Sequence, residues 1–307
     1  MRKFTSLYPQ KPNFVDILVK PSLSFITGIN NICHAAKLGG QPEQIYGYYR
    51  VFSRKKNGYF VKVLPLDKRD EVISITNSEK LFSEAGMQNL APLSIWDNTD
   101  YNSVSVCYPY IEHRYFDGAL EDVQKIMNDI VKMSNIFRDL VCKDRPSYFA
   151  QIKHALFTHS LEVKYSQKQM DCILLDDYFT KEDTFCAHND IHCGNILLSG
   201  DAPNKIIDFE ESVKFASHPL VDVCAFIERF VLPFGFSYSK SSEILSCVMG
   251  GIHHIRPASM PLLIALGRMR CHYALCLIEQ NKTNSNAHEL EKFKTLLRHW
   301  ENLDVTE

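Results

Sequence analysis

The residues best suited to chemistry lie in two short stretches, His188 to Asn195 and Ile206 to Glu210. In the first, Asp190 offers a carboxylate that can orient a hydroxyl group and take its proton. Asn195 offers a neutral oxygen to Mg²⁺ and Asp208 an anionic one, and Mg²⁺ binds oxygen ligands of this kind. Transfer of a phosphoryl group to a hydroxyl needs an aligned acceptor and metal ions that neutralise the phosphate oxygens. The two stretches therefore predict phosphoryl transfer.

A hairpin is the element that must position these oxygens. The sequence predicts strands at Asn195–Leu198 and Lys205–Phe209, and the polar residues between them are typical of a turn. Such a hairpin would return Asp208 to face Asn195.

The pattern of these residues resembles a known superfamily. His188, Asp190 and Asn195 fit His-x-Asp-x-x-x-x-Asn, and an Asp-Phe-Glu triplet follows at 208–210, as in the catalytic and metal-binding loops of protein-kinase-like enzymes. His192, two residues after the Asp, and the glutamate in place of the Gly of protein kinases look like the aminoglycoside phosphotransferase and choline kinase branch.

This resemblance implies an α+β, protein-kinase-like bilobal fold. We expect a β-rich nucleotide-binding N-lobe with one key helix at 1–107, a hinge at 108–112, and a mainly helical catalytic and substrate lobe at 113–307. The implied activity is transfer of the γ-phosphate of ATP, with Mg²⁺, to a hydroxyl of a small molecule such as an amino alcohol, a sugar or an aminoglycoside.

The resemblance also assigns roles in the first lobe. Lys62, in Tyr59-Phe60-Val61-Lys62-Val63, matches the strand lysine that contacts the α- and β-phosphates. Glu79 would hold this lysine through an ion pair, with Glu84 as the alternative. The phosphate-covering loop is expected at Gly39 and Gly40, with Gly28 as the alternative.

Further residues are expected to support the site. Tyr108, Tyr110 and Ile111 fall where the family has the hinge whose backbone pairs with adenine. Asp222 matches a family residue that supports the catalytic loop, and His188 and His192 are likewise expected to support that loop rather than react.

Elsewhere the pattern predicts strands, then helices. The further strands are Ser22–Thr27, Asn31–Leu38, Ile45–Ser53, Tyr59–Leu64, Leu93–Trp96 and Ser103–Tyr108. Asn57-Gly58, between the third and fourth of these, predicts a hairpin turn. The helices are Asn77–Gly86, Ala119–Leu140, Ser147–Val163 and most of the chain from Leu220 onward.

Composition narrows the class of protein. A formal net charge of −2 over 307 residues gives no basic footprint for a nucleic-acid partner. The apolar segment Met260–Ile278 is interrupted by Arg268, Arg270 and His272, so no membrane span is expected. Ten scattered cysteines predict free thiols in the cytoplasm.

Other functions compete with a small-molecule kinase. One is a catalytically idle kinase fold that serves as a binding or regulatory module, although every expected catalytic residue is present. Another is a kinase of a lipopolysaccharide or saccharide intermediate. A protein substrate is disfavoured because only ten residues (218 − 208) separate Asp208 from His218, too few for a typical activation segment. The acceptor, the choice between ATP and GTP, and the oligomeric state stay open.

Overall fold

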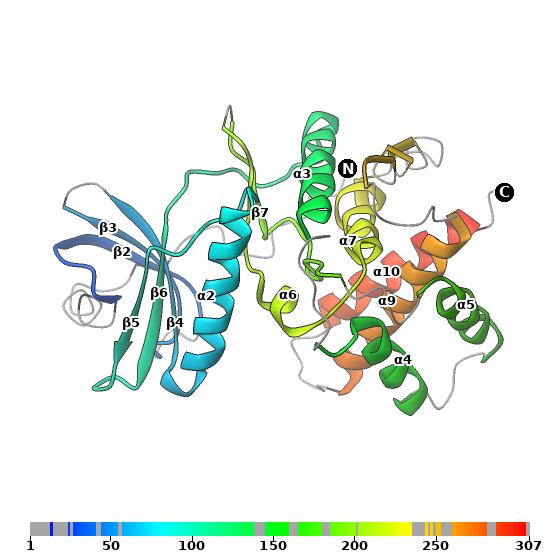
Figure 1. Ribbon diagram of the computed structural model, residues 1–307, viewed down its shortest axis with the longest axis horizontal. Helices are drawn as coiled ribbons and strands as arrows, with labels where there is room; N and C mark the ends of the chain where they lie inside the picture. Colours follow the sequence, from blue (N-terminus) through cyan, green and yellow to red (C-terminus); the bar gives the residue numbers. More distant parts are fainter. Residues whose placement is uncertain are drawn as a thin grey trace. The chain divides into compact units, whose positions relative to one another are not determined.

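The computed structural model divides the chain into two compact units, an N-terminal unit Met1–His113 and a C-terminal unit Arg114–Glu307 (Figure 1). The residues that it describes are 13–14, 24, 27–40, 44–54, 57–137, 145–159, 165–179, 185–200, 202–234, 243–244, 246–247, 250–252, 260–280 and 287–304.

The N-terminal unit is built on an antiparallel sheet with the strand order β1-β2-β3-β4-β6-β5. The strands are β1 (Asn13–Phe14), β2 (Ile32–Gly39), β3 (Gly47–Ser53), β4 (Gly58–Pro65), β5 (Ser94–Asn98) and β6 (Ser103–Pro109). The predicted hairpin around Asn57-Gly58 is confirmed as the β3–β4 pair. The predicted strand Ser22–Thr27 is wrong at Ser24 and Thr27, which are helical, and the rest of it lies outside the described residues.

Successive side chains of β4 point to opposite faces of this sheet. Val61 and Val63 are fully buried in a cluster with Val51 and other apolar residues on one face. Phe60 and Lys62, which alternate with these valines along the strand, therefore project from the opposite face.

Helix α2 (Arg69–Glu84), in the N-terminal unit, is longer than predicted. The sequence placed its start at Asn77, but a 3₁₀ turn at Leu66–Lys68 leads directly into it, and Asp70 and Glu71 supply negative charge to its first turn. Its buried residues recur every three or four positions, the spacing of one helix face: Val72, Ile75, Thr76, Glu79 and Phe82.

The C-terminal unit is mainly helical in its described part. Its elements are α3 (Leu120–Phe137), α4 (Tyr148–His159), α5 (Tyr165–Tyr178), β7 (Ile196–Leu197), β8 (Lys205–Ile206), α6 (Glu210–Lys214), α7 (Pro219–Phe226), a π-helix η2 (Ile227–Val231), a 3₁₀ turn η3 (Leu232–Phe234), α9 (Met260–Gln280) and α10 (Ala287–Asp304). The predicted strand pair is present as the shorter β7–β8 ladder. Helix α5 was not predicted.

Helices α9 and α10 pack against each other in the C-terminal unit (Figure 1). The approach is close at Gly267, where an added Cβ would lie 2.1 Å from an atom of the Trp300 ring. Trp300 is 1% exposed. Glycine at this position therefore makes room for the largest side chain of α10.

Helix α9 is long and apolar enough at Pro261–Glu279 to cross a membrane, yet half of that segment is buried within the protein. Its two arginines have carboxylate partners. Arg268 Nη2 lies 2.7 Å from Asp171 Oδ1, and Arg270 Nε lies 3.4 Å from Glu228 Oε1. We therefore assign α9 as a core helix, in line with the expected lack of a membrane span.

The cysteines are mostly free, as predicted. Eight of them are free thiols, several of them buried in the core. Cys186 is an exception, because it is disulfide-bonded. For Cys186 the prediction of a free thiol is wrong; isolated spacing along a chain carries no signal for which cysteines meet in the fold.

Candidate active site

The segment from His188 to Asn195, here the catalytic loop, is held by a buried carboxylate of α7. Asp222 is fully buried, and its two oxygens accept the backbone N–H groups of His188 at 2.7 Å and Asn189 at 2.8 Å. Burial raises the pKa of Asp222, while these two hydrogen bonds act in the opposite direction. Helix α7 begins with Pro219 after His218, whose ring accepts the Leu220 N–H. The start of a helix thus fixes the backbone of the loop.

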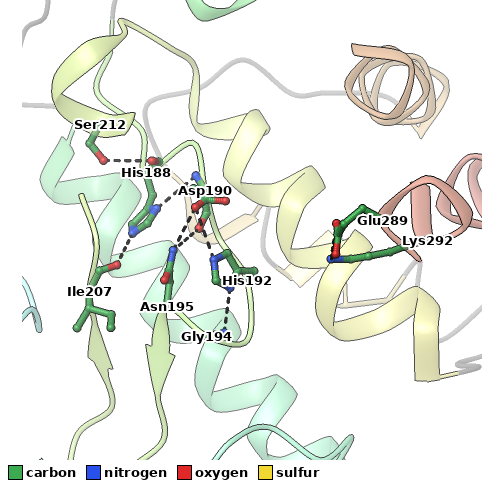
Figure 2. Close-up of polar contacts among 9 residues, drawn as sticks. All are labelled: His188, Asp190, His192, Gly194, Asn195, Ile207, Ser212, Glu289 and Lys292. Atoms are coloured by element: carbon green, nitrogen blue, oxygen red, sulfur yellow. Dashed lines mark hydrogen bonds and ion pairs between the residues drawn. The ribbon is translucent and has the colours of Figure 1, made fainter. Parts of the chain in front are cut away.

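His188 joins the catalytic loop to the segment that follows β8. Its Nδ1 lies 3.3 Å from the Asp190 N–H, and its Nε2 lies 3.0 Å from the Ile207 carbonyl oxygen (Figure 2). These contacts assign the proton of a neutral ring to Nε2. The ring also packs against Phe209, with centroids 4.7 Å apart. His188 is therefore a supporting residue in this structure.

Asp190 presents a half-exposed carboxylate at the centre of the loop (Figure 2). Its Oδ2 lies 3.5 Å from His192 Nε2 and 3.3 Å from Asn195 Nδ2. Burial opposes ionisation, but the His192 hydrogen bond and electrostatic interactions with His192, His188 and Arg229 outweigh it and lower the pKa of Asp190 to about 2. The carboxylate is therefore ionised at neutral pH and able to accept a hydrogen bond from a hydroxyl group.

His192 orients that carboxylate. Its Nδ1 accepts the Gly194 N–H at 3.0 Å, which assigns the proton of the neutral ring to Nε2, the nitrogen that faces Asp190. The imidazole is thus held in one orientation by its own loop.

Asn195 lies where the catalytic loop becomes β7. Its Nδ2 donates to the Asp190 carbonyl at 3.0 Å as well as to the carboxylate, so that the amide has a fixed orientation. The Asn195 carbonyl accepts the Ile207 N–H at 2.9 Å, which brings the residue before Asp208 alongside Asn195. This pairing is what the predicted hairpin requires.

The oxygens here fit a hard divalent cation. With Nδ2 of Asn195 directed at Asp190, Oδ1 is left with no hydrogen-bond partner in the described part of the chain. Among the described residues, no group of three or more His, Cys, Asp or Glu side chains could hold a metal ion. A site with only a few protein oxygens suits Mg²⁺, which is often held by one or two protein oxygens together with phosphates of the substrate.

Two residues of the site adopt left-handed backbone conformations. Asn189 and Asp208 each have φ of 68°. Asn and Asp tolerate this region better than most residues, but it still costs free energy. Both positions adjoin the predicted catalytic groups, and strain of this kind concentrates at functional sites.

In the N-terminal unit, Lys62 and Glu79 lie toward the same face of the sheet. Lys62 pairs with Val106 and Phe60 with Tyr108 in the β4–β6 ladder, so these side chains share a face. The Tyr108 hydroxyl donates to Glu79 Oε2 at 2.8 Å on that face. Glu79 is buried, whereas Glu84, the alternative, is exposed at the end of α2. The geometry favours Glu79.

The two candidate glycine loops differ in position. Gly39 ends β2 and Gly40 follows it, so this segment connects two neighbouring strands. Gly40 has φ of 92°, and an added Cβ would lie 2.6 Å from the Tyr46 carbonyl oxygen. Gly28 precedes β2 and packs against the Trp96 ring. The strand–loop–strand order expected of a phosphate-covering loop is found at Gly39 and Gly40.

The predicted hinge residues already have partners of their own. The Tyr110 N–H donates to the Gly58 carbonyl at 3.0 Å, and the Ile111 carbonyl lies 2.8 Å from His113 Nδ1. Tyr108 uses its hydroxyl for Glu79. An adenine base at this segment would therefore need other backbone groups or the displacement of His113.

Some residues around the catalytic loop were not predicted. Ser212 Oγ donates to the His188 carbonyl at 3.2 Å, and Arg229 accepts, through its carbonyl, a hydrogen bond from Cys193. Lys292 of α10 lies close enough to Cys193 to influence its pKa. No local pattern marks these residues, because each comes from an element distant in the sequence.

Comparison with solved structures identifies the fold. The chain superposes on spectinomycin phosphotransferase in complex with ADP and spectinomycin with a TM-score of 0.61 at 15% identity, covering 94% of this chain and 98% of that one. An aminoglycoside 2′-phosphotransferase in complex with GDP gives 0.64 at 12% identity, covering 93% and 98%. Choline kinase LicA from Streptococcus pneumoniae gives 0.56 at 14% identity, with the same coverage. No protein-family model and no curated protein matches the sequence.

The chain therefore has the kinase-like bilobal fold shared by aminoglycoside phosphotransferases and choline kinase, as the sequence predicted. At these identities the likeness defines the fold, and the activity must be argued from the site.

Proposed function

We propose that this protein is a small-molecule kinase that transfers the γ-phosphate of ATP, with Mg²⁺, to a hydroxyl group. The observation that carries the proposal is the arrangement around Asp190, an ionised, half-exposed carboxylate oriented by His192 and Asn195 in a loop anchored on Asp222. The free thiols favour the cytoplasm as the compartment in which it acts.

Asp190 accepts a hydrogen bond from the acceptor hydroxyl and orients its oxygen for attack on the γ-phosphorus. It takes the hydroxyl proton as the new O–P bond forms and the bond from the γ-phosphorus to the oxygen of the leaving ADP breaks. His192 and Asn195 keep the carboxylate in one orientation during this step. His188 and Asp222 hold the backbone of the loop.

Asn195 and Asp208 would hold Mg²⁺, which neutralises charge on the phosphate oxygens when bound. Lys62 would contact the α- and β-phosphates, with Glu79 orienting the lysine. Gly39 and Gly40 would cover the phosphates with backbone N–H groups. Tyr108, Tyr110 and Ile111 remain the proposed segment for the nucleotide base.

The competing proposal, an idle kinase fold, has less support. Such a module has no need for an ionised carboxylate with two orienting side chains, nor for left-handed backbone at Asn189 and Asp208. The nucleotide-bound relatives named above also favour a nucleotide ligand.

The test is Asp190→Asn, which keeps the shape and removes the base. We expect kcat for ADP release, over a panel of hydroxylated acceptors, to fall by about 10²- to 10⁴-fold. Binding of Mg-ATP, measured by calorimetry, should persist. The matched control is Asp176→Asn, a change at a half-exposed carboxylate of α5 that contacts Lys153. Near-normal turnover in Asp190→Asn would defeat the assignment.

A further inference from the structure

Two cationic side chains lie beside the catalytic loop. The first, Arg229, is in the π-helix η2, whose geometry is rare and occurs frequently at functional sites. Its carbonyl oxygen lies 3.7 Å from the Sγ of Cys193, which belongs to the catalytic loop. The second, Lys292, extends from α10 (Figure 2), and its charge is close enough to Cys193 to oppose the rise that burial causes in the pKa of that thiol.

One aromatic ring brings the two cations together. The Arg229 guanidinium carbon lies 5.1 Å from the centroid of the Phe293 ring, and Lys292 Nζ lies 5.8 Å from the same centroid. Contacts of this kind hold cations over an aromatic face without neutralising them. Phe293 therefore contacts both cations, and the charge of Arg229 acts on Lys292.

The two cations differ in their carboxylate partners. Lys292 has a carboxylate partner, Glu289, at 3.3 Å. The Arg229 guanidinium contacts no carboxylate among the residues that the structure describes. By contrast, Arg268 and Arg270 of the same unit each face a buried carboxylate. Arg229 differs from these structural arginines because, in the described part of the chain, the N–H groups of its guanidinium donate to no carboxylate.

The electrostatic effects agree with this geometry. Burial has the largest effect on the pKa of Lys292 and lowers it, and the positive charge of Arg229 lowers it further, as expected for two neighbouring cations away from water. An anion bound here would relieve their repulsion. A polycationic acceptor would increase it.

We propose that the acceptor carries an anionic group, a carboxylate or a phosphate, and that Arg229 and Lys292 bind this group beside Asp190. The inference rests on the proposed kinase function and specifies its substrate class. It argues against aminoglycosides and choline as acceptors for this chain, although proteins of the same fold act on them.

The test uses inorganic phosphate as the probe and needs no turnover. The nucleotide site is first saturated with Mg²⁺ and AMP-PNP, so that the γ-phosphate position is filled. Phosphate is then titrated by calorimetry into the wild type and into Arg229→Gln and Lys292→Gln. We expect saturable binding to the wild type and about 10- to 100-fold weaker binding to each variant, the loss typical of a charge-assisted hydrogen bond.

Matched variants distinguish phosphate binding at this site from nonspecific binding to surface charge. Lys294→Gln removes an exposed lysine of the same helix, α10, and should leave phosphate binding unchanged. Lys292→Arg keeps the charge and should retain most of the binding. Thermal unfolding of each variant shows whether it is folded.

Several results would overturn the proposal. The first is a wild type that shows no saturable phosphate binding. The second is a loss of phosphate binding in Lys294→Gln equal to that in the two test variants. The third is a wild type that binds choline or kanamycin saturably but does not bind phosphate. A loss of AMP-PNP affinity in Arg229→Gln, with phosphate binding intact, would instead assign the arginine to the nucleotide. The Asp190→Asn assay is independent, so the kinase function can stand when the anion site fails.

Discussion

At the scale of single residues, Cys193 stands inside the catalytic loop without a catalytic role. Its thiol points to the Arg229 carbonyl oxygen at 3.7 Å, and burial raises its pKa, so that it is a protonated donor and not a reactive thiolate. We expect Cys193→Ser to donate the same hydrogen bond and to retain most of the kcat of the wild type, measured by ADP release. Complete inactivation of a folded variant would assign Cys193 a chemical role.

Residue types and spacing point to the proposed catalytic loop directly. A carboxylate, an amide five residues later and a second carboxylate after a hairpin form a chemical pattern that sequence displays directly. The charges that act on Asp190 from elsewhere could not be predicted in this way. Arg229, whose charge acts on Asp190, comes from η2, and its contact with Phe293 of α10 depends on packing between distant segments.

At the scale of elements, α2 positions one carboxylate and exposes another. Glu79 is 2% exposed and accepts the Tyr108 hydroxyl, while its carbonyl accepts Asn89 Nδ2 at 2.8 Å. Glu84 is exposed at the last turn. Helical spacing turns these two residues to different sides, so only one of them is placed to orient the strand lysine.

This contrast gives a paired prediction. Glu79→Gln removes the charge that would hold Lys62, and we expect kcat/KM for ATP to fall by about tenfold or more, the size of a lost charged hydrogen bond. Glu84→Gln should change it little. Both variants should be checked for folding by thermal unfolding, and an equal loss in the two, or a loss only in Glu84→Gln, would contradict the assignment.

The elements themselves were predicted unevenly. The strands of the sheet were found from Val, Tyr and Phe content and from the Asn-Gly turn. The predicted start of α2 lies too far along the chain, because Asn77 and Ser78 have side chains typical of a helix N-cap although they lie within the helix. Helix α5 was missed because it has little amphipathic pattern, with Met170 and Ile173 exposed. Tertiary packing decides such helices more than their own sequence does.

At the scale of the whole molecule, the bilobal architecture was predictable although the sequence matches no family model. A few short motifs fixed the order of strands, helix and hairpin, and folds of this kind keep that order at 10–15% identity. The long C-terminal helices carry no comparable motif. These helices are held together by a buried network of side chains that no sequence motif marks.

That network centres on Glu228 of η2. Its carboxylate faces Arg270 of α9 at 3.4 Å and accepts the Trp300 Nε1–H of α10 at 3.3 Å. Burial alone would lower the pKa of Arg270, but Glu228 more than offsets burial and raises it. Glu228 is 1% exposed, so its removal would leave Arg270 as a buried charge without its carboxylate partner.

We therefore expect Glu228→Gln to destabilise the C-terminal unit by about 3–5 kcal/mol, the usual result of breaking a buried ion pair. The chain has two tryptophans, the half-exposed Trp96 in the N-terminal unit and the buried Trp300 in the C-terminal unit. In a Trp96→Phe background, Trp300 emission then reports urea unfolding of the C-terminal unit alone. The midpoint should fall by about 1–2 M urea in Glu228→Gln.

Two further variants decide whether the buried charge is the cause. Glu291→Gln, at an exposed glutamate of α10, should leave the midpoint unchanged. The double variant Glu228→Gln/Arg270→Met removes both charges and should recover much of the lost stability, because a neutral pair leaves no buried charge unpaired. If the double variant is as unstable as Glu228→Gln, the hydrogen bond to Trp300 and the fit between α9 and α10 hold the unit together, and the ion pair does not.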